Sequence, residues 1–163
     1  MKKLQTVLLL LGIFFLVFIS RLLISFHYDE FSYDSYFALR QIEQISSSGL
    51  PIFNDDLSYS GRSQLFPPIF YYLVSVFSFF GTKFAAKIVP NIFFSLIIIP
   101  TYLITHHITK RRVVGLISSL FAGFIPVTFS FINDISEYSL VLFLFLFLLY
   151  SLFPFKIATC MLS

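Results

Sequence analysis

The chain has 163 residues, of which 58% are hydrophobic and 12% charged, and its mean hydropathy is +0.90. This composition is too apolar for a soluble domain of this length. The net charge is only +3, and the basic residues stand in small clusters at the ends of apolar runs. Such clusters are typical of membrane topology signals, so we set a nucleic-acid partner aside and expect the chain to reside in a lipid bilayer.

The first apolar run, residues 4–26, follows Lys2 and Lys3. It is long enough to cross about 30 Å of hydrocarbon, and it has no small-residue cleavage site of the A-x-A kind. We therefore interpret it as an uncleaved signal anchor whose N-terminus lies in the cytoplasm.

Three later apolar runs, residues 84–107, 113–132 and 138–155, are also predicted to span the membrane. The run Pro67 to Phe80 is shorter. If it crossed as well, the basic cluster Lys110 to Arg112 would lie outside, against the positive-inside rule. We therefore expect an interfacial helix there, and an all-α membrane protein with about four transmembrane helices and a long extracytoplasmic first loop, residues 27–83.

In this topology the acidic residues all fall on one side of the membrane. The predicted cytoplasmic basic residues are Lys2, Lys3, Lys110, Arg111, Arg112 and Lys156. The predicted extracytoplasmic residues include all eight acids of the chain: Asp29, Glu30, Asp34, Glu43, Asp55, Asp56, Asp134 and Glu137. The separation indicates a shared acidic site outside; alternatively, the loops carry acids simply because spans cannot.

Within the first loop, Ser35 to Ile45 has apolar residues at near-helical spacing and reads as an amphipathic helix on the membrane surface. Asp34 is placed to cap it, and Gly49 follows its end. The pair Pro67-Pro68 is expected to open the next short helix. For Asp34 alone, a capping role and a functional role are equally supported.

The series Tyr33-Asp34-Ser35-Tyr36-Phe37-Ala38-Leu39-Arg40, followed by Gly49, resembles the first luminal loop of the catalytic subunit of oligosaccharyltransferases. The loop Asn54-Asp55-Asp56-Leu57-Ser58-Tyr59-Ser60-Gly61 is similar to that of bacterial and archaeal members. The resemblance continues through Ile88-Val89-Pro90, Thr109 to Arg112, Gly115 and Pro126, so it covers roughly Asp29 to Tyr150. No single motif is specific; the ordered series carries the resemblance.

The resemblance implies a membrane-embedded glycosyltransferase of the GT-C superfamily. Such enzymes take a sugar or oligosaccharide from a polyprenyl-phosphate or pyrophosphate carrier and pass it to a protein or lipid acceptor. Asp34 matches the acidic residue of the first loop, which implies a catalytic role and a place as ligand to Mg²⁺ or Mn²⁺. These hard cations prefer carboxylate oxygens and can neutralise a phosphate leaving group.

The second acidic motif of the family lies at the outer end of the third span, where this chain has Asp134 and Glu137. Both are implied metal ligands, and Glu137 is also implied to be catalytic. Their i, i+3 spacing departs from the oligosaccharyltransferase pattern, and Ile135-Ser136-Glu137 looks more like protein mannosyltransferases. A solvated helix start favoured by the helix dipole is the alternative interpretation.

Other charged residues are weaker candidates. Arg62 and Arg40 are predicted to bind the donor phosphate, and Asp29-Glu30 resembles an acidic pair of the mannosyltransferase branch. Arg21 and Lys87 are expected to lie near outer span ends and to snorkel, with phosphate binding as the less favoured alternative.

The chain has no Trp, and so lacks the Trp-Trp-Asp motif of the soluble domain in oligosaccharyltransferases. We therefore expect residues 1–163 to be the N-terminal module of a longer or split enzyme, inactive alone. The competing hypothesis is a non-catalytic accessory subunit or part of a transporter. A transporter would be expected to carry ionisable residues deep within its spans, and here they lie at the span ends.

Overall fold

The computed structural model describes residues 3–28, 30–55, 62–63 and 67–160, and for 54–55, 62–63 and 154–160 it describes the backbone only. Outside the first loop, the described helices are α1 (Lys3–His27), α4 (Thr82–Leu96), α5 (Ile98–Thr109), α6 (Arg112–Gly123), α7 (Pro126–Ser130) and α8 (Tyr138–Cys160). The first loop adds α2 (Tyr33–Ser48), α3 (Ile69–Val76) and a 3-10 turn, η1 (Ser78–Phe80). The described chain is thus almost entirely helical.

Three helical segments, Lys3–His27, Thr82–Thr109 and Arg112–Ser130, are long and apolar enough to cross a membrane. The apolar stretch Tyr138–Phe153 of α8 is shorter. These segments coincide closely with the four predicted spans, so the expectation of long apolar helices is confirmed. That they cross a bilayer, and in which direction, stays a prediction.

Proline interrupts two of these segments. Pro100 has no N–H to offer the carbonyl of Leu96, and α4 gives way to α5 at Ile97, whose backbone stays helical at φ −54° and ψ −27°. Pro126 opens α7, and the residue before it, Ile125, is pushed out of helical geometry to ψ 124°. The second break is therefore the sharper one.

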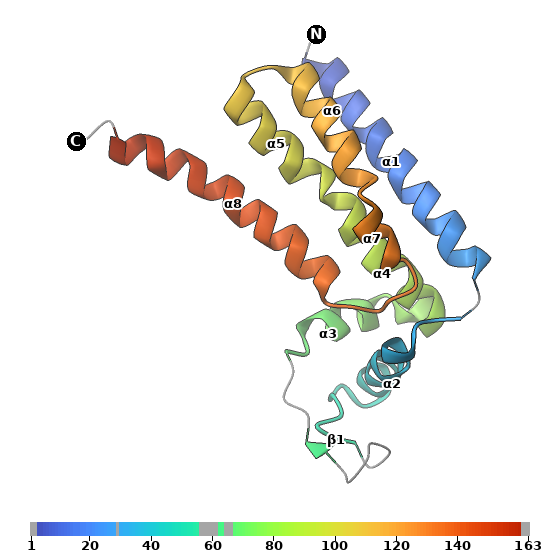
Figure 1. The fold of residues 1–163 in the computed structure, drawn as a ribbon. Helices are drawn as coiled ribbons and strands as arrows, with labels where there is room; N and C mark the ends of the chain where they lie inside the picture. Colours follow the sequence, from blue (N-terminus) through green and yellow to red (C-terminus); the bar gives the residue numbers. More distant parts are fainter. Residues whose placement is uncertain (1–2, 29, 56–61, 64–66, 161–163) are drawn as a thin grey trace.

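Two glycines allow close helix packing. A Cβ atom added at Gly115 would lie 2.9 Å from the ring of Tyr102, between α6 and α5. One added at Gly123 would lie 2.6 Å from Val17 Cγ2 on α1 and 3.2 Å from Ile98 Cδ1 on α5. Helices α1, α5 and α6 therefore approach one another more closely than larger residues would permit, and Figure 1 shows them side by side.

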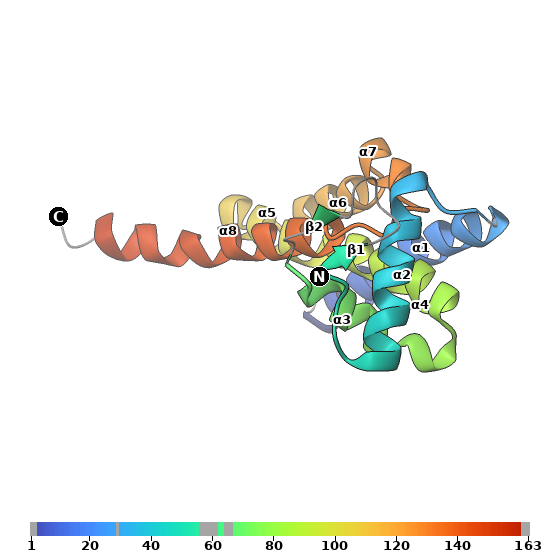
Figure 2. The ribbon, with the colours of Figure 1, turned by 90° about the horizontal axis from the view of Figure 1, so that it is seen from below.

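Helix α2 lies crosswise at one end of these helices (Figures 1 and 2). Its buried residues Leu39, Ile42 and Ile45 join a core cluster with Phe70 of α3 and Val89 of α4. The helix extends beyond the predicted Ser35–Ile45 at both ends. Its apolar face packs against other helices, and this burial is enough to explain the amphipathic pattern. That α2 lies on the membrane surface stays a prediction.

The link between α2 and α3 contains a short antiparallel ladder, β1 (Asn54–Asp55) and β2 (Arg62–Ser63), where we expected only loop. The segment that leads into β1 is held in place by Gln41, which is fully buried. The Gln41 amide donates to the Ile52 carbonyl at 2.9 Å and accepts from the Ile52 N–H at 2.8 Å. As predicted, α2 ends at Gly49, which has a positive φ of +75°. The Gly49 N–H donates to the Ile45 carbonyl.

A buried polar layer joins α1, α4 and α7, and we define it by Arg21, Asn91 and Thr128. Arg21 is 1% exposed; its Nε donates to Asn91 Oδ1 at 2.9 Å and its Nη2 to the Thr128 carbonyl at 2.8 Å. The guanidinium also lies 4.7 Å and 5.1 Å from the ring centres of Phe94 and Phe129. The expectation that Arg21 snorkels to water is therefore wrong, because polar and aromatic partners from two other helices enclose it.

The two ends of the helical array differ. The N-terminus of α1 and the connection between α5 and α6, which contains Lys110 and Arg111, lie together at one end (Figure 1). Helices α2 and α3 and the connection between α7 and α8 lie at the opposite end. Helix α2 and the connection between α7 and α8, which are distant in sequence and both carry acidic residues, thus meet there.

Candidate functional site: an acidic pocket

A pocket of about 310 Å³ lies where the first turn of α2 faces the connection between α7 and α8. Asp34, Asp134 and Glu137 all line it. We call it the acidic pocket. The structure therefore brings the three predicted acidic residues to one place, although about one hundred residues separate Asp34 from the other two.

The two sides of the acidic pocket are joined by hydrogen bonds around Ser35. The Ser35 hydroxyl accepts the N–H of Ile135 at 2.8 Å and donates to the Asn133 carbonyl at 3.5 Å. The N–H of Ser32 reaches the same carbonyl at 3.3 Å. Since Ser35 and Ile135 are both buried, these bonds are shielded from water and fix the positions of Asp34 and Asp134.

Asp34 does not cap α2, contrary to one of the two predicted roles. The helix begins at Tyr33, with Ser32 as the extended residue before it at φ −63° and ψ 158°. Asp34 is thus inside the first turn, where a carboxylate still interacts favourably with the helix dipole. Its side chain is exposed, so it can meet a ligand entering the pocket.

Glu137 is held by a neighbour that the sequence did not single out. The hydroxyl of Tyr71, on α3, donates to Glu137 Oε2 at 3.2 Å. Burial of Tyr71 raises the pKa of its hydroxyl well above the usual range, and the nearby charge and hydrogen bond of Glu137 raise it further. Tyr71 therefore stays protonated at neutral pH and orients one carboxylate oxygen of Glu137.

The predicted divalent metal has carboxylate ligands of the right chemistry in this pocket. However, no three His, Cys, Asp or Glu side chains converge on a point that could hold a metal ion, as far as the described residues extend. The acidic pocket is not a preformed metal centre, and the roles of Asp34, Asp134 and Glu137 as metal ligands stay predictions.

Of the remaining predicted site residues, Arg40 and Glu30 are not part of the described lining. Arg40 lies further along α2, with its guanidinium 5.8 Å from the ring centre of Phe37, which does line the pocket. Glu30 is exposed and outside the lining. The side chain of Arg62 and the whole of Asp29 lie outside the described residues.

No protein-family model, curated protein or solved structure matches this chain. What the chain does must therefore be argued from its own residues.

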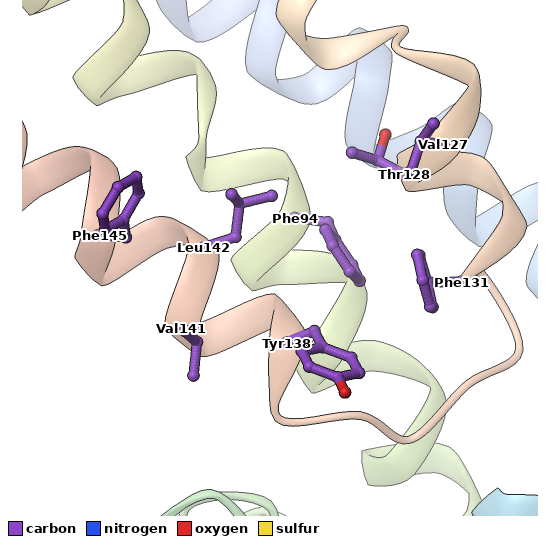
Figure 3. Close-up of a pocket in the computed structure, with 8 residues that line it drawn as sticks. All are labelled: Phe94, Val127, Thr128, Phe131, Tyr138, Val141, Leu142 and Phe145. Carbon is purple, nitrogen blue, oxygen red and sulfur yellow. The ribbon is translucent and has the colours of Figure 1, made fainter.

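An apolar cavity adjoins the acidic pocket. It measures about 370 Å³ and lies between α4, α7 and α8, as Figure 3 shows. Its lining is Phe94, Val127, Thr128, Phe131, Tyr138, Val141, Leu142 and Phe145. Phe131 and Tyr138 line both spaces, with ring centres 6.2 Å apart. The two spaces therefore share a wall made of two aromatic rings.

Sequence reasoning missed these aromatic residues and Tyr71. Each stands in a run of apolar and aromatic residues, and the chain has 24 Phe and 9 Tyr. Among so many aromatic residues, the sequence does not distinguish the few whose rings line a pocket. Only the order of the helices in space shows that Phe131 and Tyr138 separate an acidic space from an apolar one.

Proposed function

We propose that this chain is the N-terminal membrane module of a glycosyltransferase of the GT-C type, which uses a polyprenyl-linked sugar donor and a protein or lipid acceptor. The observation that carries the proposal is the acidic pocket beside the apolar cavity. A polyprenyl-linked sugar combines a polar head with a long apolar chain. A site for it needs both environments in contact, and Phe131 and Tyr138 border both.

In this proposal the carboxylates act on the acceptor. Asp34 is exposed at the pocket and free to accept a hydrogen bond or a proton from an incoming nucleophile. Glu137, oriented by Tyr71, holds the sugar or the acceptor from the opposite side. A positioned general base contributes about 10²- to 10⁴-fold to a transfer rate, which is the scale expected of Asp34.

The charge of the acidic pocket limits how a donor phosphate approaches. Three carboxylates repel a phosphate, and neither Arg40 nor another basic side chain belongs to the described lining. A phosphate therefore needs a cation to approach closely. For this reason Mg²⁺ or Mn²⁺ stays part of the proposal, although no chemical step is assigned to it here.

The proposal also fixes an orientation. The positive-inside rule puts the end with Lys110, Arg111 and Arg112 in the cytoplasm. The acidic pocket, at the opposite end of the helices, then faces the extracytoplasmic side. Cysteines introduced at Thr82 and Thr109 test this: an impermeant thiol reagent should label the first in intact cells and the second only after permeabilisation.

The function itself is tested by photocrosslinking, because binding can be measured without turnover. The purified chain in lipid nanodiscs is exposed to a polyprenyl-phosphate hexose with a photoreactive group on the sugar, with Mg²⁺ or Mn²⁺ present. We expect label in α2 and residues 131–138. A hydrogen bond to a charged group contributes about 1.5–3 kcal/mol, so Asp34→Asn and Glu137→Gln should each reduce labelling about 10- to 100-fold.

The matched control is Glu43→Gln, since Glu43 is an exposed acid on the same helix as Asp34 but outside the pocket lining. It should label like the parent chain. Labelling that is unaffected by Asp34→Asn and Glu137→Gln, or equal with a polyprenyl phosphate without sugar, would contradict the proposal. A parallel sample with a chelator in place of Mg²⁺ or Mn²⁺ tests whether labelling depends on the metal.

A further inference from the structure

Another pocket, with no lining residue in common with the acidic pocket, lies where the end of α1 meets the start of α4. It measures about 320 Å³ and is lined by Phe26, Phe31, Lys83, Phe84 and Lys87. We call it the lysine pocket. Two ammonium groups and three aromatic rings form its walls, a combination that the proposed transfer reaction does not use.

Lys87 is the better fixed of the two lysines. It is 7% exposed, and its Nζ donates to the carbonyls of Ser25 at 2.9 Å and Tyr28 at 2.6 Å. Both carbonyls lie at the C-terminal end of α1, where a cation is favoured by the helix dipole. Its Nζ also lies 5.5 Å and 5.4 Å from the ring centres of Phe26 and Phe31. An ammonium group has three donors, so one remains beyond these two bonds.

The charge of the lysine pocket is not balanced by the described part of the chain. Lys83 and Lys87 are four residues apart on α4, a spacing at which like charges on a helix repel. Within the described residues, no salt bridge joins either lysine to an acidic side chain. Lys87 has two carbonyl acceptors and Lys83 is exposed, but two positive charges this close together still attract an anion. The pocket therefore favours an anionic ligand.

The surroundings of the lysine pocket indicate which anion. It lies at the ends of two helices that are long and apolar enough to cross a membrane, where lipid phosphates are found. Phe26 and Phe84 are 44% and 46% exposed, and their rings are 5.8 Å apart. Just before α4, Phe79 and Phe80 are 72% and 69% exposed. These rings suit acyl chains, which a free phosphate does not have.

We propose that the lysine pocket binds the phosphate of an anionic membrane lipid, with Lys83 and Lys87 contacting the phosphate and Phe26 and Phe84 contacting the acyl chains. This inference is independent of the proposed transferase function. The lipid phosphate would supply a negative charge that the described residues do not place in this lining.

The absence of Trp from the sequence makes a direct test possible. A Phe84→Trp chain carries one fluorescent reporter in the lysine pocket. It is reconstituted in phosphatidylcholine bilayers in which a fixed fraction of lipid is brominated phosphatidylglycerol or brominated phosphatidylcholine. An interfacial basic residue contributes about 1 kcal/mol to binding an anionic lipid, or about fivefold in affinity. We therefore expect the anionic lipid to quench the reporter with several-fold higher apparent affinity.

Two variants in the Phe84→Trp background and one separate control chain assign the effect. Lys83→Gln should remove about fivefold of the preference, whereas Lys83→Arg should retain it. The hydrogen bonds to Ser25 and Tyr28 come from Lys87, so Lys83→Gln tests the ligand without removing them. Phe121→Trp, in a chain with Phe84 intact, places the reporter at a 72% exposed position on α6, where both lipids should quench equally.

Equal quenching of the Phe84→Trp reporter by both lipids would overturn the proposal. So would a preference that Lys83→Gln leaves unchanged. If inorganic phosphate abolishes the preference and sodium chloride at the same ionic strength does not, the site takes free phosphate and the assignment to a lipid is wrong.

Discussion

The buried polar layer and the acidic pocket each join an early helix, α1 or α2, to segments 70 to 107 residues later, but their polar groups differ in how fully the protein satisfies them. In the polar layer, Arg21 bonds to Asn91 and to the Thr128 carbonyl, and Asn91 bonds further to the carbonyls of Lys87 and Ile132. In the acidic pocket, Asp34 is exposed and Glu137 is half-buried, with Tyr71 donating to one of its oxygens.

This difference separates a structural role from a functional one. Polar groups that the protein satisfies from several sides stabilise the arrangement of helices, and losing one partner leaves the others unpaired. Polar groups left accessible in a pocket add little to stability but can contact a ligand. Substitutions in the polar layer should therefore reduce stability, and substitutions of the pocket acids should reduce binding with little effect on stability.

The largest expected loss of stability comes from Arg21→Met. Methionine fills much of the same space but donates no hydrogen bond, so Asn91 Oδ1 and the Thr128 carbonyl lose their partner in a buried place. We expect the free energy of unfolding in detergent micelles to fall by about 2–4 kcal/mol. Arg111→Met, at an exposed arginine, should change it by less than about 0.5 kcal/mol. Similar losses in both variants would show that the polar layer is not a stabilising feature.

The second prediction tests whether the close packing of α6 against α1, next to the polar layer, contributes to stability. Gly123→Ala puts a Cβ atom 2.6 Å from Val17, one helical turn before Arg21 on α1. The helices must separate, so we expect a loss of about 1–3 kcal/mol. Gly12→Ala is the control, because a Cβ atom at Gly12 meets nothing within 4 Å. A Gly123→Ala chain as stable as the Gly12→Ala chain would mean that this contact relaxes without cost.

The smallest effect is expected at the edge of the acidic pocket, where Tyr71→Phe removes the donor to Glu137. Near pH 7 we expect a loss of about 0.5–1.5 kcal/mol. Because the fold raises the pKa of Tyr71, its contribution is complete below the unfolded-state value near pH 10 and is lost as the pH rises further. The stability difference between parent and variant should therefore shrink above about pH 10, as followed by thermal unfolding at pH 7 and pH 10.5. A constant difference would refute the assigned cause of the shift.

Much of the helical arrangement was predictable because it depends on local features of the chain. Length and hydropathy located the long apolar helices, and Gly49 marked the end of α2 because glycine adopts positive φ without strain. The short run 67–80 indeed forms α3 and η1, too short to span. These features depend on a few neighbouring residues, and so the sequence is informative about them.

Features that depend on spatial neighbours were predicted less well. Asp34 was a plausible cap, but α2 begins one residue earlier, at Tyr33. There, Ser32 and Ser35 form hydrogen bonds to residues 133–135, which are distant in sequence. Arg21 was expected to reach water, but Asn91, 70 residues later, holds it inside. The gathering of Asp34, Asp134 and Glu137 in one pocket followed from a family resemblance rather than from periodicity, and their chemical roles stay predictions.

The hydrogen bonds that link the start of α2 to residues 133–135 determine which side chains of the acidic pocket can be replaced. Apart from the Ser35 hydroxyl, the bonds between the start of α2 and residues 133–135 use main-chain atoms. Main-chain partners do not change when side chains do. The residues at positions 34, 134 and 137 can therefore be exchanged while the frame that carries them keeps its geometry. A library randomised at these three positions, with Ser35 retained, should yield mostly folded chains, which makes the pocket a practical starting point for selecting new ligand specificities.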